Sequence, residues 1–470
     1  MYDIPLSRRR FLTDSSLGFG ALALSQLLSR DGFTADRDPK SPLAAGPTDF
    51  PGTAKNVIFL FMQGGPSHLE TFDPKPELIR LDGKPLPGSF RDIDLAQVNT
   101  ADGKLMGATV PFERRGESGL EISNVLPHIA QHADDLAVIR SCYHETFIHG
   151  SALTLMHSGT LLLGHPSVGS WVVYGLGCES DSLPAYVAMT DNMFRNGSAT
   201  FSSGFLPAVY QGTHLRTEGA PIQNLSRPRQ LDLGDQRLLL DQVNEWNELH
   251  KDRRPGDSRL DARISNYELA FRMQSAAPEL IDISSEPESV RKLYGLDKKP
   301  SERFGRMCLL ARRMVERGVR YVHLVSNDWD GHGEVVKNHQ AQSGETDLPI
   351  AGLMTDLKQR GLFDSTLLVW AGEFGRTPIM QGRRGRDHHP YGFSTWMAGG
   401  GIRGGKVIGA TDDLGFHAVE DKVHVNDLHA TILSLLGLDH EKLTYLFEGR
   451  FRRLTDVGGK NDLAERLVRA

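Results

Sequence analysis

The chain has 470 residues, of which 39% are hydrophobic and 24% charged, so it can bury a large core and is neither fibrous nor disordered. Its net charge of -6 at pH 7 provides no general basic field, which excludes recruitment of nucleic acid and addressing to an anionic membrane surface. A small anionic substrate is compatible with this charge if basic residues gather locally.

The N-terminus carries the motif S-R-R-x-F-L at residues 7–12, with Arg8 and Arg9 ahead of a modest apolar segment at residues 17–28. This pattern is typical of twin-arginine export signals; an amphipathic first helix beside an unrelated arginine run is the alternative. The apolar segment is short and interrupted by glycine, so no stable membrane span is expected. We predict a signal and linker at residues 1–50, the twin-arginine translocase as a partner during export, and a periplasmic or exported protein.

Buried strands are predicted from short apolar runs. Residues 56–62, NVIFLFM, end at a Gly-Gly-Pro turn and are typical of a central parallel strand. Similar runs lie at residues 136–140, 184–189, 319–325 and 365–372, and helical patterns at 301–317, 346–360 and 426–436. This alternation predicts an α/β fold in which helices cover both faces of a mostly parallel sheet.

Two further features concern domain organisation and redox state. Residues 230–294 are charged, helical in pattern and poor in strand signals, which predicts a helical insertion at about residues 229–300 of a domain spanning 51–470. The chain has only three cysteines, Cys142, Cys178 and Cys308, so at most one disulfide can form.

The first predicted strand is followed by two glycines that let the backbone approach a ligand, and then by Ser67 and His68. Both side chains are candidates for contact with a substrate. The alternative is structural, because Ser67 and Glu70 fit the S-x-x-E capping box that opens many helices.

The stretch after the second predicted strand, SCYHETFIHGSALTLMHSG, also carries polar candidates. Thr146, His149 and Ser151 flank the start of a predicted helix, where a hydroxyl or imidazole facing an anion gains from the helix N-terminus. His157 falls inside the same helix and is predicted to be packed rather than catalytic.

The stretch NDWDGHG follows the predicted strand at 319–325, where an open α/β sheet places its ligands. Asp328 and His332 are four residues apart, and Asp330 lies between them as a further oxygen ligand. Carboxylate and neutral imidazole suit a borderline divalent ion such as Zn²⁺ or Mn²⁺. The alternative is a solvated turn whose aspartates cap the next helix.

Two later segments favour the metal site. Glu373 follows the strand at 365–372 and is a candidate ligand or general base. The loop QGRRGRDHHPYG then brings His388 and His389, either of which is a candidate ligand. Three successive strand ends would thus offer Asp and His, then Glu, then His, to one site at the carboxyl edge of the sheet.

The same region is rich in arginine. Arg376, Arg383 and Arg386 offer bidentate donors suited to the oxygens of phosphate or sulfate. We therefore expect them to bind an anionic substrate.

Five segments together resemble a bacterial, twin-arginine-exported family, domain-of-unknown-function family 1501, and more widely the alkaline phosphatase, sulfatase and phosphoglycerate mutase superfamily. These segments are GGPSHLETFDPKP, HGSALTLMHSG, NDWDGHG, AGEFGRTP and DHHPYGFSTWMAGGG. The resemblance implies an alkaline-phosphatase-like sheet between helices, two divalent metals at its carboxyl edge, and a nucleophile that attacks phosphate or sulfate.

Position by position, the resemblance implies one complete metal site. Asp328 and His332 resemble the superfamily's D-x-x-x-H ligand pair, and His388 or His389 resembles its late histidine ligand. The second site departs from the pattern: Gln63 stands where an aspartate is usual, and Glu373 is followed by Phe374 where Asp-His is usual.

The nucleophile position also departs from the superfamily pattern. His149 lies near it, with Thr146 and Ser151 on either side. Cys142 and Cys178 lack the formylglycine motif, and Cys308, which has Arg312 four residues on, has Leu310 where Pro or Ala is required.

The sequence thus predicts an exported metal-dependent hydrolase of phosphate or sulfate esters that does not depend on formylglycine. Its cofactor is expected to be a divalent metal, Zn²⁺ first, with Mn²⁺, Ca²⁺ or Mg²⁺ as alternatives, and its substrate a small anionic or glycan ester. The competing hypothesis is a catalytically eroded relative that binds anionic glycans or other anionic ligands without hydrolysis, because Gln63 and Phe374 replace usual ligands.

Overall fold

The computed structural model describes residues 42–88, 103–216, 222, 225, 227, 230–254 and 258–468, so the Arg8 and Arg9 motif lies outside the described residues. Its centre is β1 (Asn56–Met62), which pairs in parallel with β7 (Tyr321–Ser326) on one side and β8 (Thr366–Ala371) on the other. The side chains of all three strands are buried. The continuous apolar runs in the sequence therefore correctly indicated strands covered on both faces.

The main sheet has nine strands in the order β12-β4-β11-β8-β1-β7-β5-β6, with β15 also paired to β4. The strands not yet bounded are β4 (Ala137–Tyr143), β5 (Tyr186–Thr190), β6 (Thr213–His214), β11 (Phe393–Gly399), β12 (Lys406–Ile408) and β15 (Val423–His424). Among the described strands of this sheet, only β11 runs antiparallel to its neighbours. The carboxyl ends of β4, β8, β1, β7 and β5 therefore meet at one edge, and the predicted mostly parallel sheet is confirmed.

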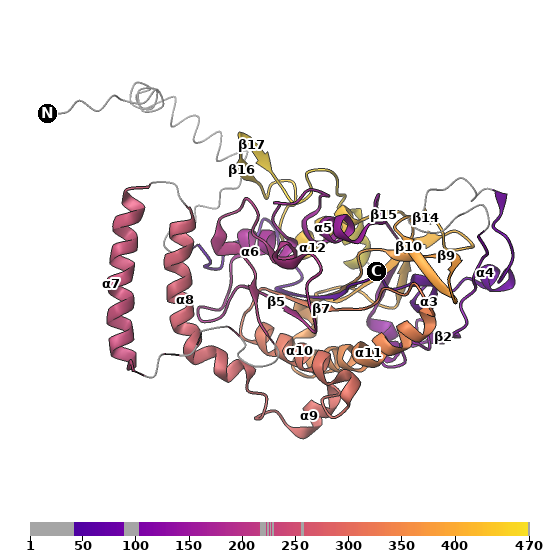
Figure 1. The fold of residues 1–470 in the computed structure, drawn as a ribbon, viewed down its shortest axis with the longest axis horizontal. Helices are drawn as coiled ribbons and strands as arrows, with labels where there is room; N and C mark the ends of the chain where they lie inside the picture. Colours follow the sequence, from indigo (N-terminus) through magenta and orange to yellow (C-terminus); the bar gives the residue numbers. More distant parts are fainter. Residues whose placement is uncertain are drawn as a thin grey trace.

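Helices cover both faces of the sheet (Figure 1). Alternate residues of β1 point to opposite faces: Phe59 and Phe61 join one hydrophobic core, and Leu60 and Met62 join the other. The first core includes side chains from α5 (His149–Ser158), α6 (Val168–Leu176) and α12 (Val425–Leu435). The second includes side chains from α10 (Lys299–Glu316) and α11 (Val335–Gln359).

The charged stretch predicted to be an insertion forms α7 (Leu233–Asp252), α8 (Ser258–Ile281) and α9 (Glu288–Leu293). Asp232 caps α7 by accepting a hydrogen bond from the backbone of Asp235. Arg237 donates to Glu268 at 2.8 Å and so links α7 to α8. Figure 1 shows α7 standing at the outer side of α8, away from the central sheet.

Smaller elements complete the described chain. Two short helices, α3 (His68–Thr71) and α4 (Pro76–Arg80), follow β1, and α13 (Asp462–Val468) lies near the C-terminus. The remaining strands form the pairs β2 (Phe112–Arg115) with β3 (Leu120–Ser123), β9 (Gly375–Gln381) with β10 (Gly385–His389), β13 (Ala410–Thr411) with β14 (Ala418–Glu420), and β16 (Tyr445–Phe447) with β17 (Arg450–Arg452). The three cysteines are buried and free. Within the described ranges, no helix has the length and apolar character needed to cross a membrane.

One prediction of local structure was wrong. The stretch QGRRGRDHHPYG was expected to be a loop after a strand of the main sheet, but most of it forms the turn and second strand of the β9–β10 hairpin. The hairpin is held against the loop after β7 because the Arg386 amide donates to the Gly331 carbonyl at 3.0 Å. Two further backbone hydrogen bonds of 3.0 Å run from Glu334 to Arg383 and from Val335 to Arg384.

The contact between this hairpin and the β7 loop generates a prediction. A Cβ at Gly385 would lie 1.9 Å from the His332 carbonyl oxygen, so Gly385→Ala must push the two backbones apart. We expect the free energy of unfolding to fall by roughly 1–3 kcal/mol, as for other overpacked sites, measured by urea denaturation. The control is Gly333→Ala in the same loop, where a Cβ meets nothing within 4 Å. Equal stability of the two variants would contradict the proposed contact.

Candidate functional site

Polar side chains gather at the carboxyl edge of the sheet because five parallel strands end there. Gln63 follows β1, Asp330 lies in the loop after β7, and Glu373 lies just after β8. His149 is the first residue of α5, which follows β4, and Arg195 follows β5. The fold therefore brings together residues more than 200 positions apart, as open α/β sheets do at their ligand sites.

Asp330 is the centre of this cluster. Its Oδ1 lies 3.0 Å from His332 Nε2, 3.3 Å from His388 Nε2 and 2.6 Å from Arg376 Nη2. Its Oδ2 lies 3.1 Å from His149 Nε2 and 3.4 Å from Arg195 Nη1. Burial alone would raise the pKa of this carboxyl, but the hydrogen bonds from the three histidines and the charge of Arg376 outweigh it and hold the pKa far below its ordinary value.

The imidazoles of His332 and His388 face each other, with their Nε2 atoms 2.9 Å apart. His388 Nδ1 donates to the Phe147 carbonyl at 2.9 Å, and His332 Nδ1 lies 2.6 Å from the side-chain oxygen of Gln381. These partners place a proton on each Nδ1, so in the neutral rings both Nε2 atoms present lone pairs. Two nitrogens and one carboxylate oxygen thus converge, and this set is stabilised by a cation between its members, either a proton shared with Asp330 or a metal ion.

These residues fit a divalent metal on grounds independent of any relative. Asp330, His332 and His388 supply two nitrogens and one oxygen, and the contacts of both Nδ1 atoms are the outer hydrogen bonds that orient metal-ligating histidines. Asp387 also brings a carboxylate oxygen close to the same two histidines. A mixed set of imidazole and carboxylate ligands suits Zn²⁺ better than Ca²⁺ or Mg²⁺, which prefer oxygen alone.

His149 bridges two carboxylates. Its Nδ1 lies 2.7 Å from Glu373 Oε1, and its Nε2 lies 3.1 Å from Asp330 Oδ2. Burial opposes the charged ring, but the hydrogen bonds to Asp330 and Glu373 dominate and raise the pKa of His149. These contacts favour the protonated ring of His149, whose centroid lies 4.9 Å from that of the Phe374 ring.

Glu373 is fixed by the glycine turn after β1. Both of its carboxylate oxygens accept from the Gly64 amide at 3.0 Å, and its side chain is fully buried. Burial would raise its pKa, but His149 and the Gly64 amide lower it, so Glu373 stays ionised. Gly64 is required here: its φ is 121°, and a Cβ would lie 2.6 Å from the Asp330 amide nitrogen.

The structure separates the two aspartates predicted as ligands. Asp330 joins the cluster, whereas Asp328 is exposed and has a left-handed φ of 66°. Trp329, between them, is buried in the core. The left-handed turn at Asp328 directs its side chain outward, so the D-x-x-x-H spacing of Asp328 and His332 does not correspond to a contact in the structure.

The structure also distinguishes the adjacent histidines. His388 faces Asp330, whereas His389 points to the other side of β10 and donates through Nε2 to the Phe416 carbonyl. Burial lowers the pKa of His389 to about 3, so its ring is neutral. His389 is not brought to the cluster.

The three predicted anion-binding arginines have other positions. Arg386 is fully buried and pairs with Glu70 at 2.7 Å. Arg376 is also fully buried, and it donates to the Gly64 and Gly65 carbonyls as well as to Asp330. Arg383 is exposed at the turn of the β9–β10 hairpin. Arg376 and Arg386 thus hold the site together and offer no free fork to a substrate, which corrects their predicted role.

Four other candidates do not reach Asp330 or Glu373 through any hydrogen bond found in the described part of the chain. Ser67 is buried and caps α3 without a side-chain hydrogen bond, so the capping box with Glu70 is not formed. His68 is buried and its Nε2 lies 2.9 Å from the Gly415 carbonyl. Thr146 accepts from the Ile148 amide at 3.3 Å, and Ser151 lies half-buried in the first turn of α5.

Sequence reasoning missed Arg195, whose side chain is 30% exposed and reaches Asp330. Gln63 positions it, because the Gln63 side-chain oxygen accepts from the Arg195 amide at 3.1 Å. The amide nitrogen of Gln63 donates to Asn327 and to the Met193 carbonyl, so this side chain is used for structure. The sequence did contain a signal for Arg195, namely its position after a predicted strand. The carboxyl end of that strand, β5, lies at the same edge of the sheet as the cluster.

Comparisons with known proteins found one matching family model and several solved structures of low similarity. No curated protein matches the sequence. The PsFucS1 sulfatase from Pseudoalteromonas sp. is a similar solved structure, with a TM-score of 0.39 and 12% identity over 95% of this chain and 74% of that chain. A Vibrio parahaemolyticus protein of the alkaline phosphatase superfamily has a TM-score of 0.35 and 11% identity, covering 91% and 78% of the two chains.

The alkaline phosphatase from the Antarctic bacterium TAB5 is also similar, with a TM-score of 0.32 and 10% identity over 82% of this chain and 98% of that chain. These likenesses carry no statement about the chemistry of the site. A family model matches residues 54–465. Because that match spans most of the sequence, the chain belongs to the family described as Protein of unknown function (DUF1501).

Proposed function

We propose that this protein is an exported, metal-dependent hydrolase of phosphate or sulfate esters. The observation that carries the proposal is the convergence of the Asp330 carboxylate with His332 and His388, whose Nε2 atoms lie 2.9 Å apart. These three residues would hold a divalent ion. We expect Zn²⁺, because their donor atoms are two imidazole nitrogens and one carboxylate oxygen. Such an ion polarises an ester oxygen and lowers the pKa of bound water.

The neighbouring residues supply proton transfer and charge. His149 carries a proton on Nε2, on the side of the metal ligands, and gives it to the leaving oxygen as the ester bond breaks. Glu373 keeps His149 oriented by accepting from Nδ1 at 2.7 Å. Arg195 is partly exposed beside Asp330 and is placed to neutralise the ester oxyanion.

A second candidate function is binding of an anionic ligand without hydrolysis. It is favoured by Gln63, whose amide groups are all engaged within the protein, and by Phe374, whose ring stacks on His388 at 4.6 Å between centroids. Neither residue offers a ligand for a second metal. The two functions are separated with 4-nitrophenyl phosphate and 4-nitrophenyl sulfate. Turnover of either ester supports the hydrolase, whereas a raised melting temperature without turnover supports the binding protein.

The metal site is tested with matched variants of the two aspartates. We expect about one equivalent of zinc per chain by elemental analysis, lost in Asp330→Asn and kept in Asp328→Asn, because only Asp330 contacts the histidines. His388→Gln and His389→Gln form a second matched pair with the same expectation. Loss of metal in Asp328→Asn with retention in Asp330→Asn would overturn this ligand assignment.

The role of His149 is tested by His149→Gln. We expect kcat to fall by about 10²–10⁴-fold while the metal content is unchanged, because a proton donor and not a ligand is removed. Since the pKa of His149 is raised, the proton is present below that pKa and is lost as the pH rises through it, so kcat of the parent enzyme falls on the alkaline side. A variant that keeps this alkaline fall would show that another group is the acid.

Export is tested at the twin-arginine motif, which lies outside the described residues. We expect the Arg8→Lys, Arg9→Lys double variant to accumulate inside the cell, because the translocase recognises the arginine pair. Arg10→Lys is the matched control and should still be exported. Fractionation followed by immunodetection measures both, and normal export of the double variant would contradict the motif assignment.

A further inference from the structure

The outer side of α7 carries large apolar side chains that are open to solvent. Leu238, Leu239, Trp246 and Leu249 are 69%, 54%, 62% and 54% exposed. Figure 1 shows this helix outermost, beyond α8 and away from the central sheet. Several large apolar side chains exposed together on one helix indicate a surface that binds another helix.

Polar groups help to hold the opposite side of α7 to its own protein. Arg237 donates to Glu268 of α8 at 2.8 Å, and Asn244 donates to the same carboxylate at 2.5 Å. Asn247 is the buried residue of this helix. α7 thus attaches to α8 partly through hydrogen bonds, while its largest apolar side chain, Trp246, faces solvent.

The exposed stripe on α7 has a regular spacing. Its residues are Asp235, Leu239, Gln242, Trp246, Leu249 and Arg253, and all of them are exposed. Neighbouring members are alternately four and three positions apart, which is the spacing of the contact stripe between two paired helices. Because this spacing reads the same in both directions, the stripe can pair with an antiparallel copy of itself.

An antiparallel pair of α7 helices would bring the apolar side chains together. Leu239 would contact the partner subunit's Leu249, and Trp246 would contact the partner subunit's Gln242. Each contact would occur twice, because two-fold symmetry makes the two contacting surfaces identical. Two leucine pairs and two covered tryptophans would then form the centre of the interface, and tryptophan is a frequent anchor of protein interfaces.

The charges at the two ends of the stripe favour this direction of pairing. Asp235 lies in the first turn of α7 and Arg253 follows its last turn, about 27 Å away along the axis, so the two cannot pair within one chain. In the antiparallel arrangement, Asp235 lies opposite the partner subunit's Arg253 at both ends. A parallel arrangement would place like charges opposite each other, so charge complementarity selects the antiparallel one.

We propose that α7 is a self-association surface, through which two copies of this protein pair antiparallel. Glu245 lies beside the stripe near its middle and faces its own copy, so its charge opposes the pairing and limits the strength of association. The interface lies in the helical insertion. The inference therefore depends neither on the metal-ligand cluster nor on ester hydrolysis.

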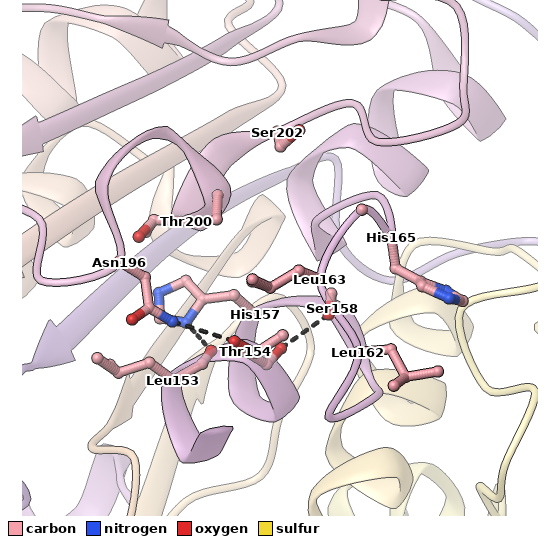
Figure 2. A pocket seen from close by; sticks show the side chains of 12 residues that line it. Leu153, Thr154, His157, Ser158, Leu162, Leu163, His165, Asn196, Thr200 and Ser202 are labelled. Carbon is pink, nitrogen blue, oxygen red and sulfur yellow. Dashed lines mark hydrogen bonds between the residues drawn. The ribbon is translucent and has the colours of Figure 1, made fainter. Parts of the chain in front are cut away.

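Sedimentation equilibrium of the full-length protein tests the pairing. We expect the mass to rise with concentration from the 51.9 kDa of one chain to twice that value. Trp246→Glu places a charge at the centre of the interface and should leave a monomer at every concentration. Leu163→Glu is the matched control and should still associate, because Leu163 is also exposed but lines the cavity beside α5 (Figure 2).

Three results of this measurement would overturn the proposal. They are a parent protein that stays at the mass of one chain, association that survives Trp246→Glu, and equal loss of association in the two glutamate variants. Because Trp246 and Leu163 are both exposed, neither substitution removes a side chain from the core.

An exchange of charges tests the direction of the pair. Asp235→Arg alone and Arg253→Asp alone each put like charges opposite each other at both ends, and we expect each to weaken association about tenfold. The double variant Asp235→Arg, Arg253→Asp restores opposite charges and should associate like the parent protein. Failure of the double variant to recover would contradict the antiparallel pairing.

Trp246 reports which molecule covers the stripe. The other four tryptophans of the chain are buried, namely Trp171, Trp329, Trp370 and Trp396. We expect acrylamide quenching of Trp246 fluorescence to decrease as the protein concentration rises, in parallel with the mass. Protection of Trp246 that does not change with concentration would assign its cover to the same chain, such as the apolar run at residues 17–28, and would overturn self-association.

Discussion

The negative charge of Asp330 is the constraint on which the site depends. Side chains from α5, the β7 loop, β9, β10 and the segment after β5 all converge on this one carboxylate. The two Nε2 atoms of His332 and His388 face each other beside this carboxylate, and its charge favours a cation between them. Asp330 thus holds together the loops that follow the parallel strands. It also fixes the position at which a metal and a substrate would bind.

The buried arginines explain how this charge is kept in place. The side chain of Arg376 is fully buried. It donates hydrogen bonds to the Asp330 carboxylate and to the carbonyls of Gly64, Gly65 and Arg386. It joins the glycine turn after β1 to the β9–β10 hairpin, and Glu70 compensates Arg386 on the other side. Because a buried cation is costly without such partners, removal of any one of them affects the geometry at Asp330 through the backbone as well as through charge.

The sequence predicted the architecture well, because continuous apolar runs such as that of β1 directly indicate strands covered on both faces. The sequence also predicted that Asp, His and Glu side chains lie close together, because they follow parallel strands whose carboxyl ends meet at one edge of the sheet. The sequence did not show that Asp330 and not Asp328 joins the cluster, because this depends on the left-handed backbone of Asp328. It also did not show that His388 and not His389 does so, because this depends on the register of the β9–β10 hairpin. Arg376 and Arg386 were predicted to bind an anionic substrate, because their partners within the protein lie up to 316 residues away in sequence.

The engagement of Gln63 and Glu373 favours chemistry at a single metal. Gln63 uses both ends of its amide to position Asn327, Met193 and Arg195, and Glu373 is saturated by the Gly64 amide and His149. A second ion would have to break these contacts, whereas an ion at His332 and His388 would only replace the hydrogen bonds that their Nε2 atoms make with Asp330. In the proposed mechanism, His149 lies between Glu373 and Asp330 and supplies the proton for the leaving oxygen.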